Sequence, residues 1–327
     1  MKRILMLDTS IGTGNMGDHI IMECIRSELA PILDNSFVYN MSTHLTSFNE
    51  LSVLKNFSVV EGYSSCDLKF AGGTNLLVKN LLHPYPQWNV NKITARPFVG
   101  TVLVGVGAGA GDKTNSYTQK LYRKMLSHEY YHSVRDERSK QYVEQLGLKA
   151  INTGCATMWM LTPDFCGTIP KAKASRVVFT LTARIASKPV DERDQQLIDI
   201  LLKNYDKVYY WVQGEHDLAY FNRLKNTENI TVLPPSLKAY DRLLCEDDLD
   251  YVGTRLHGGI YAMRHRKRAI IISVDERASS INESNNLNCI TKDEIGTALE
   301  EKINASFATE IRMPLDKIKE WKAQFSD

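Results

Sequence analysis

The chain has 327 residues, which is too long for one ordinary hydrophobic core and fits about two domains of roughly 150 residues each. Its 40 basic residues nearly balance its 38 acidic residues, so the formal net charge is only +2. This balance gives no reason to expect nucleic acid or an anionic membrane as a partner. Any anion binding must therefore be local.

The six cysteines include no C-x-x-C pair and no histidines at zinc-finger spacing, so we expect reduced thiols and no metal site. The apolar run 4–7 is too short for the core of a signal peptide. The longest apolar stretch, 98–111, is shorter than the roughly 20 residues that a membrane-spanning helix needs. We therefore expect a soluble, cytoplasmic protein without a transmembrane segment.

The first half of the chain alternates short apolar runs with amphipathic segments, which is typical of a parallel sheet covered by helices. Ile21, Cys24, Ile25 and Leu29, for example, recur at the three-to-four spacing of one helix face. The predicted strands cover residues 3–8, 36–40, 66–71, 98–106 and 132–135. The predicted helices cover residues 17–33, 74–82, 116–127 and 137–146.

A segment with Pro163, Gly167 and Pro170 interrupts this rhythm over residues 162–175 and indicates a linker or a crossover. After it, the predicted strands cover residues 176–183, 208–213, 230–233, 249–252 and 269–274. The predicted helices cover residues 191–205, 217–225, 239–245, 259–266, 278–283, 294–303 and 315–325.

These patterns predict an α/β protein with two Rossmann-like domains that face a cleft. We expect an N-terminal domain over residues 1–165 and a C-terminal domain over residues 175–310. Residues 311–327 are expected to form a helix that packs back on the N-terminal domain.

The loop after the first predicted strand carries Gly12, Gly14 and Gly17, which allow the backbone to approach a ligand. The N–H groups at a helix start attract anions or sugar hydroxyls, so Asn15 and Asp18 join Gly14 and Gly17 as candidate binding residues. The glycine spacing formally matches a dinucleotide fingerprint, but the acidic residue expected about 20 positions later is not evident. The alternative is a tight turn in which Asp18 stabilises the helix start.

Two further glycine-bearing turns follow predicted strands, at Gly72–Gly73 and over residues 105–111. Turns at the carboxyl ends of parallel strands line one crevice, which is the usual ligand side of such a sheet. Arg135 ends the next predicted strand, and we expect it to face this crevice. Each glycine alone is also explained by a turn that needs a residue without Cβ, and Asp136 by a helix cap.

The most informative motif runs from Gly253 to Gly259 and includes Arg255 and His257 at the start of a predicted helix. It places a guanidinium, an imidazole and helix N–H groups within one turn. A fixed cation beside a group that titrates near neutrality suits an anionic substrate that gains or loses a proton. The alternative is a histidine satisfied in the core, which does not account for the adjacent arginine and glycines.

Two other runs have simpler explanations. The basic run 264–268 falls at the predicted end of the same helix, where cations on the surface complement exposed carbonyls. The aromatic residues Tyr209, Tyr210 and Trp211 are expected in a buried strand rather than in a stacking platform.

Four of these motifs together resemble the polysaccharide pyruvyl transferase family. They are Gly-Asn-Met-Gly-Asp at 14–18, Gly72–Gly73, Val-Arg-Asp-Glu-Arg-Ser at 134–139 and Val-Gly-Thr-Arg-Leu-His-Gly at 252–258. They occur in the family's order and span most of the chain. The Arg-Leu-His element is the most specific of them.

The resemblance implies transfer of the enolpyruvyl unit of phosphoenolpyruvate to two hydroxyls of a sugar in a capsule or exopolysaccharide precursor. A cyclic ketal forms and phosphate leaves. It also implies a fold like that of GT-B glycosyltransferases, with the acceptor on the N-terminal domain and the donor on the C-terminal domain. A lipid-linked acceptor would add peripheral membrane contact.

The resemblance assigns roles to three residues. Arg135 and Arg255 would hold the phosphate and the carboxylate of the donor, and His257 would protonate its methylene carbon. Arginine suits this task because its fork matches both anionic groups and it keeps its charge. The implied reaction requires no metal and no redox cofactor.

One departure lies after the strand that follows the Arg-Leu-His helix, where family members often carry a lysine and this chain has Arg277. Arg277 keeps a charge for binding the substrate but does not act as a proton donor. Two alternatives therefore stay open. One is a GT-B-type glycosyltransferase that uses a nucleotide-activated sugar, although no acidic E-x7-E element is found in the second domain. The other is a non-catalytic glycan-binding protein.

Overall fold

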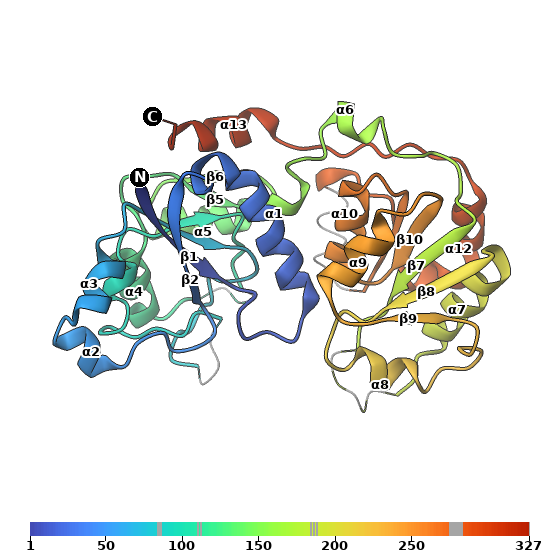
Figure 1. The fold of residues 1–327 in the computed structure, drawn as a ribbon, viewed down its shortest axis with the longest axis horizontal. Coiled ribbons are helices and arrows are strands. Elements are labelled where there is room, and N and C mark those ends of the chain that lie inside the picture. Colours follow the sequence, from blue (N-terminus) through green and yellow to red (C-terminus); the bar gives the residue numbers. More distant parts are fainter. Residues whose placement is uncertain are drawn as a thin grey trace. The chain divides into compact units, whose positions relative to one another are not determined.

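The structure, a computed structural model, describes residues 1–83, 87–109, 111, 113–183, 185, 187, 189–274 and 284–326. Its contacts divide the chain into two compact units (Figure 1). Unit 1 comprises Met1–Thr13, Ile21–Trp159 and Pro314–Asp327, and unit 2 comprises Gly14–Ile20 and Met160–Met313. Gly14–Ile20 thus belongs to unit 2, whereas the sequence placed all of residues 1–165 in one domain.

Unit 1 is built on parallel strands, and its main sheet has the order β2-β1-β3-β4. A second parallel pair, β5-β6, continues from β4 through a bridge between Val106 and Val134. The strands are β1 (Lys2–Asp8), β2 (Ser36–Ser42), β3 (Leu68–Gly72), β4 (Val102–Val104), β5 (His132–Val134) and β6 (Ala150–Asn152).

Helices cover the strands of unit 1, and the C-terminal helix belongs to this unit (Figure 1). Trp321 of this last helix donates its indole N–H to the Tyr131 carbonyl at 2.7 Å. The helices are α1 (Met16–Leu33, whose first turn belongs to unit 2), α2 (Glu50–Leu54), α3 (Ser58–Ser64), α4 (Ser116–Met125), α5 (Glu137–Gln145) and α13 (Leu315–Ala323), with short 3-10 helices η1 (Arg96–Phe98) and η2 (Ala156–Met158).

Unit 2 has one parallel sheet with the strand order β12-β11-β10-β7-β8-β9. The strands are β7 (Arg176–Thr180), β8 (Lys207–Trp211), β9 (Thr231–Leu233), β10 (Leu249–Gly253), β11 (Ala269–Ser273) and β12 (Cys289–Thr291). The helices are α6 (Pro163–Cys166), α7 (Glu192–Asn204), α8 (Asp217–Phe221), α9 (Leu237–Leu244), α10 (Leu256–Arg264), η3 (Lys292–Glu294) and α12 (Ile295–Asn304).

The central strands of unit 2 are covered on both faces. Helices α7 and α12 pack together on one face, and α9 and α10 lie over the other (Figure 1). Strands β10 and β11 are consequently buried along their whole length, and the predicted burial of Tyr209, Tyr210 and Trp211 in β8 is confirmed. The predicted α/β class with parallel sheets is confirmed as well.

Two predicted elements of unit 1 are wrong. Residues 74–82, all of them described, form turns instead of a helix, because their backbone pairs with the segment after β4: Gly107 N–H donates to Thr74 O at 2.8 Å and Leu77 N–H to Gly107 O at 3.2 Å. The predicted strand 98–106 is reduced to β4, because Pro97 lies in η1 and Gly100 has a φ of +87°.

Short elements were missed in the sequence, and one predicted helix cannot be compared. Strands β6 and β12 have three residues each, and α2 and α3 have five and seven, too few to establish a periodicity. The predicted helix 278–283 lies outside the described residues.

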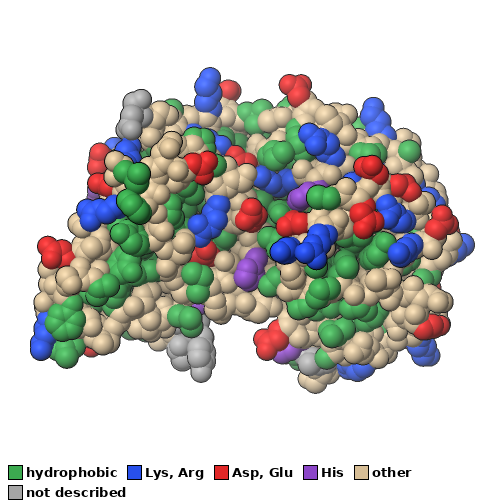
Figure 2. All heavy atoms as spheres, in the orientation of Figure 1, with side chains coloured by type: hydrophobic (Ala, Val, Ile, Leu, Met, Phe, Trp, Pro, Cys, Tyr) green, Lys and Arg blue, Asp and Glu red, His purple; other side chains and the backbone are tan. Residues whose placement is uncertain are grey.

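The surface placement predicted for the basic run 264–268 is wrong at its end. Lys267 and Arg268 are buried, and Lys267 Nζ donates to the Glu246 carbonyl at 2.6 Å. Elsewhere charges of both signs are interspersed on the surface, as Figure 2 shows for one face of the molecule. All six cysteines are free, and none of the helices in the described ranges is both long and apolar enough to span a bilayer.

A buried histidine takes part in the hydrogen bonding between β4 and β5. His132 has no exposed surface, its Nδ1 accepts the Leu103 N–H at 3.1 Å, and its Nε2 lies 3.0 Å from the Ser127 carbonyl. A backbone N–H needs an unprotonated acceptor and a carbonyl needs a donor, so the ring is neutral with its proton on Nε2. Burial lowers the pKa of His132 from 6.5 to about 4.

The protein should lose stability as the pH falls from 6.5 towards 4, because in this range His132 is protonated in the unfolded chain but not in the folded one. Its contribution is complete above pH 6.5 and declines by up to about 3 kcal/mol below it. Urea unfolding at pH 4 to 7 would measure this in the wild type and in His132→Asn, whose amide does not titrate. Equal pH dependence in both proteins would contradict the prediction.

A buried ion pair links β10, the residue before β11 and the end of α12 in unit 2. Arg268 Nη1 donates to Asp250 Oδ2 at 2.6 Å, and Arg268 Nη2 donates to the carbonyls of Ile303 and Ala305, each at 2.8 Å. Tyr205 donates its hydroxyl to the same carboxylate at 2.8 Å. Burial nevertheless raises the pKa of Asp250, so this carboxylate depends on its partners.

Arg268→Met should lower the free energy of unfolding by about 3–5 kcal/mol, because it leaves the Asp250 carboxylate buried without its counter-ion. The matched control is Lys203→Met, which removes the exposed ion pair between Lys203 and Glu300 and should cost less than about 1 kcal/mol. Urea denaturation of both variants measures the difference. Losses of similar size would show that the buried pair contributes no more than the exposed one.

Candidate functional site

Three neighbouring strands of unit 2 end at the same edge of its sheet. Because β10, β7 and β8 are parallel and adjacent, the residues that follow Gly253, Thr180 and Trp211 meet there. The segment after β10 enters α10, and the segment after β8 enters α8. The carboxyl edge of a parallel sheet is the usual place for a ligand.

Arg255 is fixed at this edge by residues from the other two strands. Its Nη2 lies 2.6 and 2.7 Å from the two carboxylate oxygens of Asp217, and its Nε donates to the Leu181 carbonyl at 3.0 Å. The Arg255 side chain is 17% exposed, while Asp217 is fully buried. Arg255 therefore offers a ligand chiefly Nη1, which makes no hydrogen bond to any residue that the structure describes.

Asp217 is held in turn by the backbone. Its two oxygens accept the N–H groups of Gly214 at 2.7 Å and Ala183 at 2.9 Å. A side chain at Gly214 would collide with the Arg255 guanidinium and with the Asp217 carboxylate. The pair of Arg255 and Asp217 thus requires glycine at position 214.

His257 lies in the first turn of α10, two residues after Arg255, the N-cap. It is half-buried, so its imidazole is not enclosed in the core. The backbone below it is held by Tyr251, which donates its hydroxyl to the Arg255 carbonyl at 2.7 Å. Side chains at Gly258 and Gly259 would both press against Tyr251, so these glycines allow close packing of α10 on β10.

The start of α1 reaches the same edge of unit 2. Met16 N–H donates to the Gln213 carbonyl at 2.8 Å, and Glu215 N–H donates to the Gly14 carbonyl at 3.1 Å. Asn15 caps the helix, since its Oδ1 accepts the Gly17 N–H at 3.1 Å. The predicted binding residues Gly14, Asn15, Gly17 and Asp18 therefore share unit 2 with Arg255 and His257.

The other predicted site residues lie at the carboxyl edge of unit 1. Arg135 follows β5, is 11% exposed, and donates through Nη2 to the Asn75 side-chain oxygen. Its nearest carboxylate is that of Asp136, whose Oδ2 lies 3.4 Å from Nε and whose Oδ1 caps α5. A side chain at Gly107 would collide with the Arg135 guanidinium.

Gly72 and Gly73 end β3 at this edge. Gly73 has a φ of +81°, which favours glycine, and a side chain at either position would collide with α1, at Met22 and Ile25 or at Ile21. The packing of α1 thus accounts for both glycines. The predicted site residue Arg277 lies outside the described residues.

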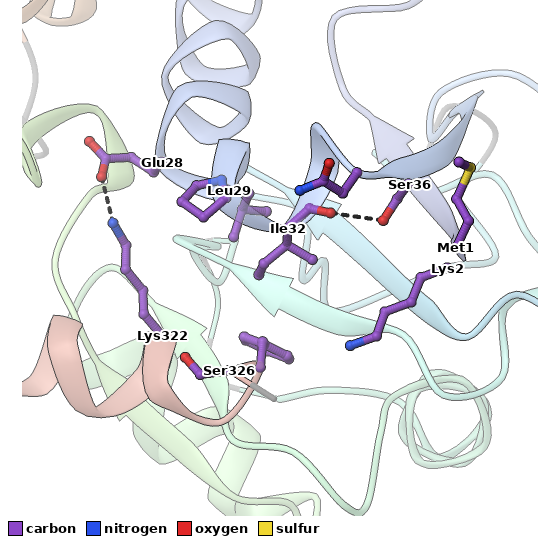
Figure 3. A pocket seen from close by; sticks show the side chains of 11 residues that line it. Met1, Lys2, Glu28, Leu29, Ile32, Ser36, Lys322 and Ser326 are labelled. Carbon is purple, nitrogen blue, oxygen red and sulfur yellow. Dashed lines mark hydrogen bonds and ion pairs between the residues drawn. The ribbon is translucent and has the colours of Figure 1, made fainter.

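Two grooves in the described residues lie away from these edges. A groove of about 540 Å³ in unit 1 lies where β1 and β2 begin, and Figure 3 shows Lys322 of α13 reaching Glu28 of α1 across one side of it. Another of about 360 Å³ lies between α6 and the segment 308–312 of unit 2. Among the described residues, His, Cys, Asp and Glu side chains form no group that could hold a metal ion.

Sequence reasoning missed three residues of these edges: Asp217, Gln213 and Asn75. Asp217 follows a predicted strand and opens a helix, and such acids are usually explained as dipole-favoured first-turn residues. Its partner Arg255 is 38 residues away, so only the fold reveals the pair.

Comparisons with known proteins agree with this picture. One solved structure similar to this chain is the S. aureus MnaA-UDP co-structure, which has 11% sequence identity and a TM-score of 0.52 and covers 94% of this chain and 92% of that one. Another is the Methanocaldococcus jannaschii UDP-GlcNAc 2-epimerase in complex with UDP-GlcNAc and UDP, which has 13% identity and a TM-score of 0.54 and covers 99% of both chains. They confirm the predicted GT-B-like fold. The comparison with curated proteins gives no match.

The family described as polysaccharide pyruvyl transferase matches residues 15–276, a range that includes Asn15, Arg135, Arg255 and His257. The predicted resemblance is thereby confirmed. The chain belongs to the polysaccharide pyruvyl transferase family.

Proposed function

We propose that this protein transfers the pyruvyl group of phosphoenolpyruvate to two hydroxyls of a sugar in a surface-polysaccharide precursor, with formation of a pyruvate ketal and release of phosphate. The family match supports a transferase of this class. The observation that carries the proposal is the half-buried His257 in the first turn of α10, two residues after an arginine that Asp217 holds in place.

The proposed transfer needs an acid that protonates the enol carbon and positive groups that bind the anionic donor. His257 donates a proton to the methylene carbon of the enol, which becomes a methyl group, and positive charge develops at the adjacent carbon. One sugar hydroxyl bonds to that carbon and loses its proton. The second hydroxyl then replaces the phosphate and also loses its proton, so one proton returns to His257 and the other leaves with phosphate.

The basic residues that the family resemblance singles out suit this anionic donor. Arg255 Nη1 and the N–H groups at the start of α10 bind an anionic group of phosphoenolpyruvate. Arg135, whose Nη2 bonds to the neutral Asn75 side chain, is assigned to the other anionic group, as the family resemblance implies. Arg277 adds a further cation, and the substrate contacts the backbone of Gly72 and Gly73, whose Cβ positions are closed by α1.

The remaining assignments concern the acceptor. Gly14, Asn15, Gly17 and Asp18 bind sugar hydroxyls, and the acceptor is linked to a lipid or to a nucleotide. The transfer involves no net change in oxidation state, so it needs no redox cofactor. We place the reaction in the cytoplasm, with peripheral membrane contact where the acceptor is lipid-linked.

Replacement of His257 by Gln should reduce phosphate release from phosphoenolpyruvate by about 10²–10⁴-fold, because the enol carbon loses its proton donor. Binding of phosphoenolpyruvate should persist, because the imidazole acts in the transition state. Phosphate release across a panel of acceptor sugars and calorimetry of donor binding measure the two effects.

The matched control is His265→Gln at the other end of the same helix. His265 bonds to the Tyr261 carbonyl and lies 3.8 Å from Asp241, so its loss should leave phosphate release unchanged. Full activity of His257→Gln would remove the assignment of His257 as the acid. If nucleotides of uridine or cytidine stabilise the protein and phosphoenolpyruvate does not, the nucleotide-sugar alternative takes its place.

Arg255→Lys should raise the KM for phosphoenolpyruvate by about tenfold or more, although the positive charge is kept. A lysine cannot bond to both Asp217 and the Leu181 carbonyl and still direct a donor to the ligand. Steady-state kinetics would measure this, with the exposed Arg242→Lys of α9 as control. An unchanged KM in Arg255→Lys would show that charge alone suffices at this position.

A further inference from the structure

The most unusual polar side chain of unit 2 is that of Gln213, two residues after the end of β8. It is 2% exposed, and its Oε1 is buried without a hydrogen-bond partner among the residues that the structure describes. Its Nε2 also makes no hydrogen bond to any residue within the described ranges. Buried amides nearly always have partners, because an unsatisfied polar group is costly in the interior.

The surroundings of Gln213 are built around its amide. A Cβ at Gly17, in the first turn of α1, would lie 3.2 Å from Gln213 Nε2, and a Cβ at Gly258, in the first turn of α10, would lie 2.8 Å from Gln213 Oε1. The amide therefore rests against the backbone of two helix starts. Both of these positions are glycines, and a side chain at either one would displace the Gln213 amide.

Other polar groups gather at the same place. The Cβ position of Gly17 is also 3.2 Å from Asn15 Oδ1, so the side-chain amides of Asn15 and Gln213 both lie against this glycine. The first turn of α1 is bonded to the backbone of Gln213, since Met16 N–H donates to its carbonyl at 2.8 Å. All of these residues belong to unit 2, and Gln213 is followed by Gly214, whose Cβ position lies against the Arg255 guanidinium.

We propose that Gln213 is a sugar-binding residue that recognises a hydroxyl of the acceptor. This inference rests on the proposed function and adds a residue that neither the sequence motifs nor the family resemblance assigns. A side-chain amide has one acceptor oxygen and one donor NH₂ group, and a hydroxyl both donates and accepts. Two neighbouring sugar hydroxyls can therefore satisfy the amide, one donating to Oε1 and the other accepting from Nε2. An anion would satisfy only Nε2.

The proposal explains why the amide is unsatisfied without a ligand. If Gln213 served only to hold the two helices, its amide would be expected to bond to one of them, and within the described residues it bonds to neither. A site that hydrogen-bonds a substrate hydroxyl keeps polar groups unpaired until the substrate arrives and then rejects analogues that lack that hydroxyl. The unsatisfied amide therefore lowers the stability of the ligand-free protein.

Gln213→Met tests this directly, because methionine has nearly the same length and volume but no amide. Without ligand, the variant should unfold at the same temperature as the wild type or higher, since an unsatisfied polar group is removed. With saturating phosphoenolpyruvate, its KM for p-nitrophenyl β-D-galactoside or p-nitrophenyl β-D-glucoside should rise by about tenfold or more. The KM for phosphoenolpyruvate should change less than about twofold.

The matched control is Gln195→Met in α7. Gln195 has the partners that Gln213 lacks: its Nε2 donates to Asp199 and to the Lys225 carbonyl, and its Oε1 accepts the Lys225 N–H. This variant should unfold at a lower temperature and keep both KM values. A loss of stability in Gln213→Met as large as in Gln195→Met, or an unchanged KM for both sugars, overturns the inference.

A second readout separates this inference from the proposed function. Calorimetry of the two glycosides with wild type and Gln213→Met measures sugar binding without turnover. Weaker binding by Gln213→Met supports the inference even when no phosphate is released, an outcome that counts against the proposed function alone. Equal heats from both proteins, including none from either, overturn the assignment of Gln213.

Discussion

The site of unit 2 depends on one ion pair, that of Arg255 and Asp217. Asp217 is fully buried and takes backbone N–H groups from two loops, while Arg255 bonds to a carbonyl of one of these loops. The pair thus joins the segments that follow β7, β8 and β10. Since an unpaired buried carboxylate is strongly unfavourable, the loops at this edge are held in one arrangement, and His257 is positioned on the turn that follows.

The sequence predicted the parallel α/β architecture because strand and helix periodicities are local properties. It failed where tertiary pairing overrides the local pattern. Residues 74–82 have a helical pattern, yet their backbone bonds to the segment 107–109. Arg268 belongs to a run that looks like a surface cap, yet a carboxylate on β10 and the end of α12 enclose it.

Among the site residues, too, those in a local motif were predicted and those that depend on tertiary contacts were missed. Arg255 and His257 were predicted because they are adjacent in the chain and share a helix start. Asp217 and Gln213 were not, because a lone acid or amide after a strand has an ordinary explanation, and only burial shows that one is paired and the other is not.

The pairing of Arg255 with Asp217 also affects how strongly salt weakens the binding of an anion. Because Asp217 balances the charge of Arg255 before any substrate arrives, the guanidinium contributes oriented hydrogen-bond donors rather than a long-range electrostatic field. An incoming anion then meets a short-range, partly desolvated contact, and counter-ions in solution compete with it only weakly. The contribution of Arg255 to donor affinity should consequently vary little between dilute and concentrated buffer, in contrast to that of an unpaired surface lysine.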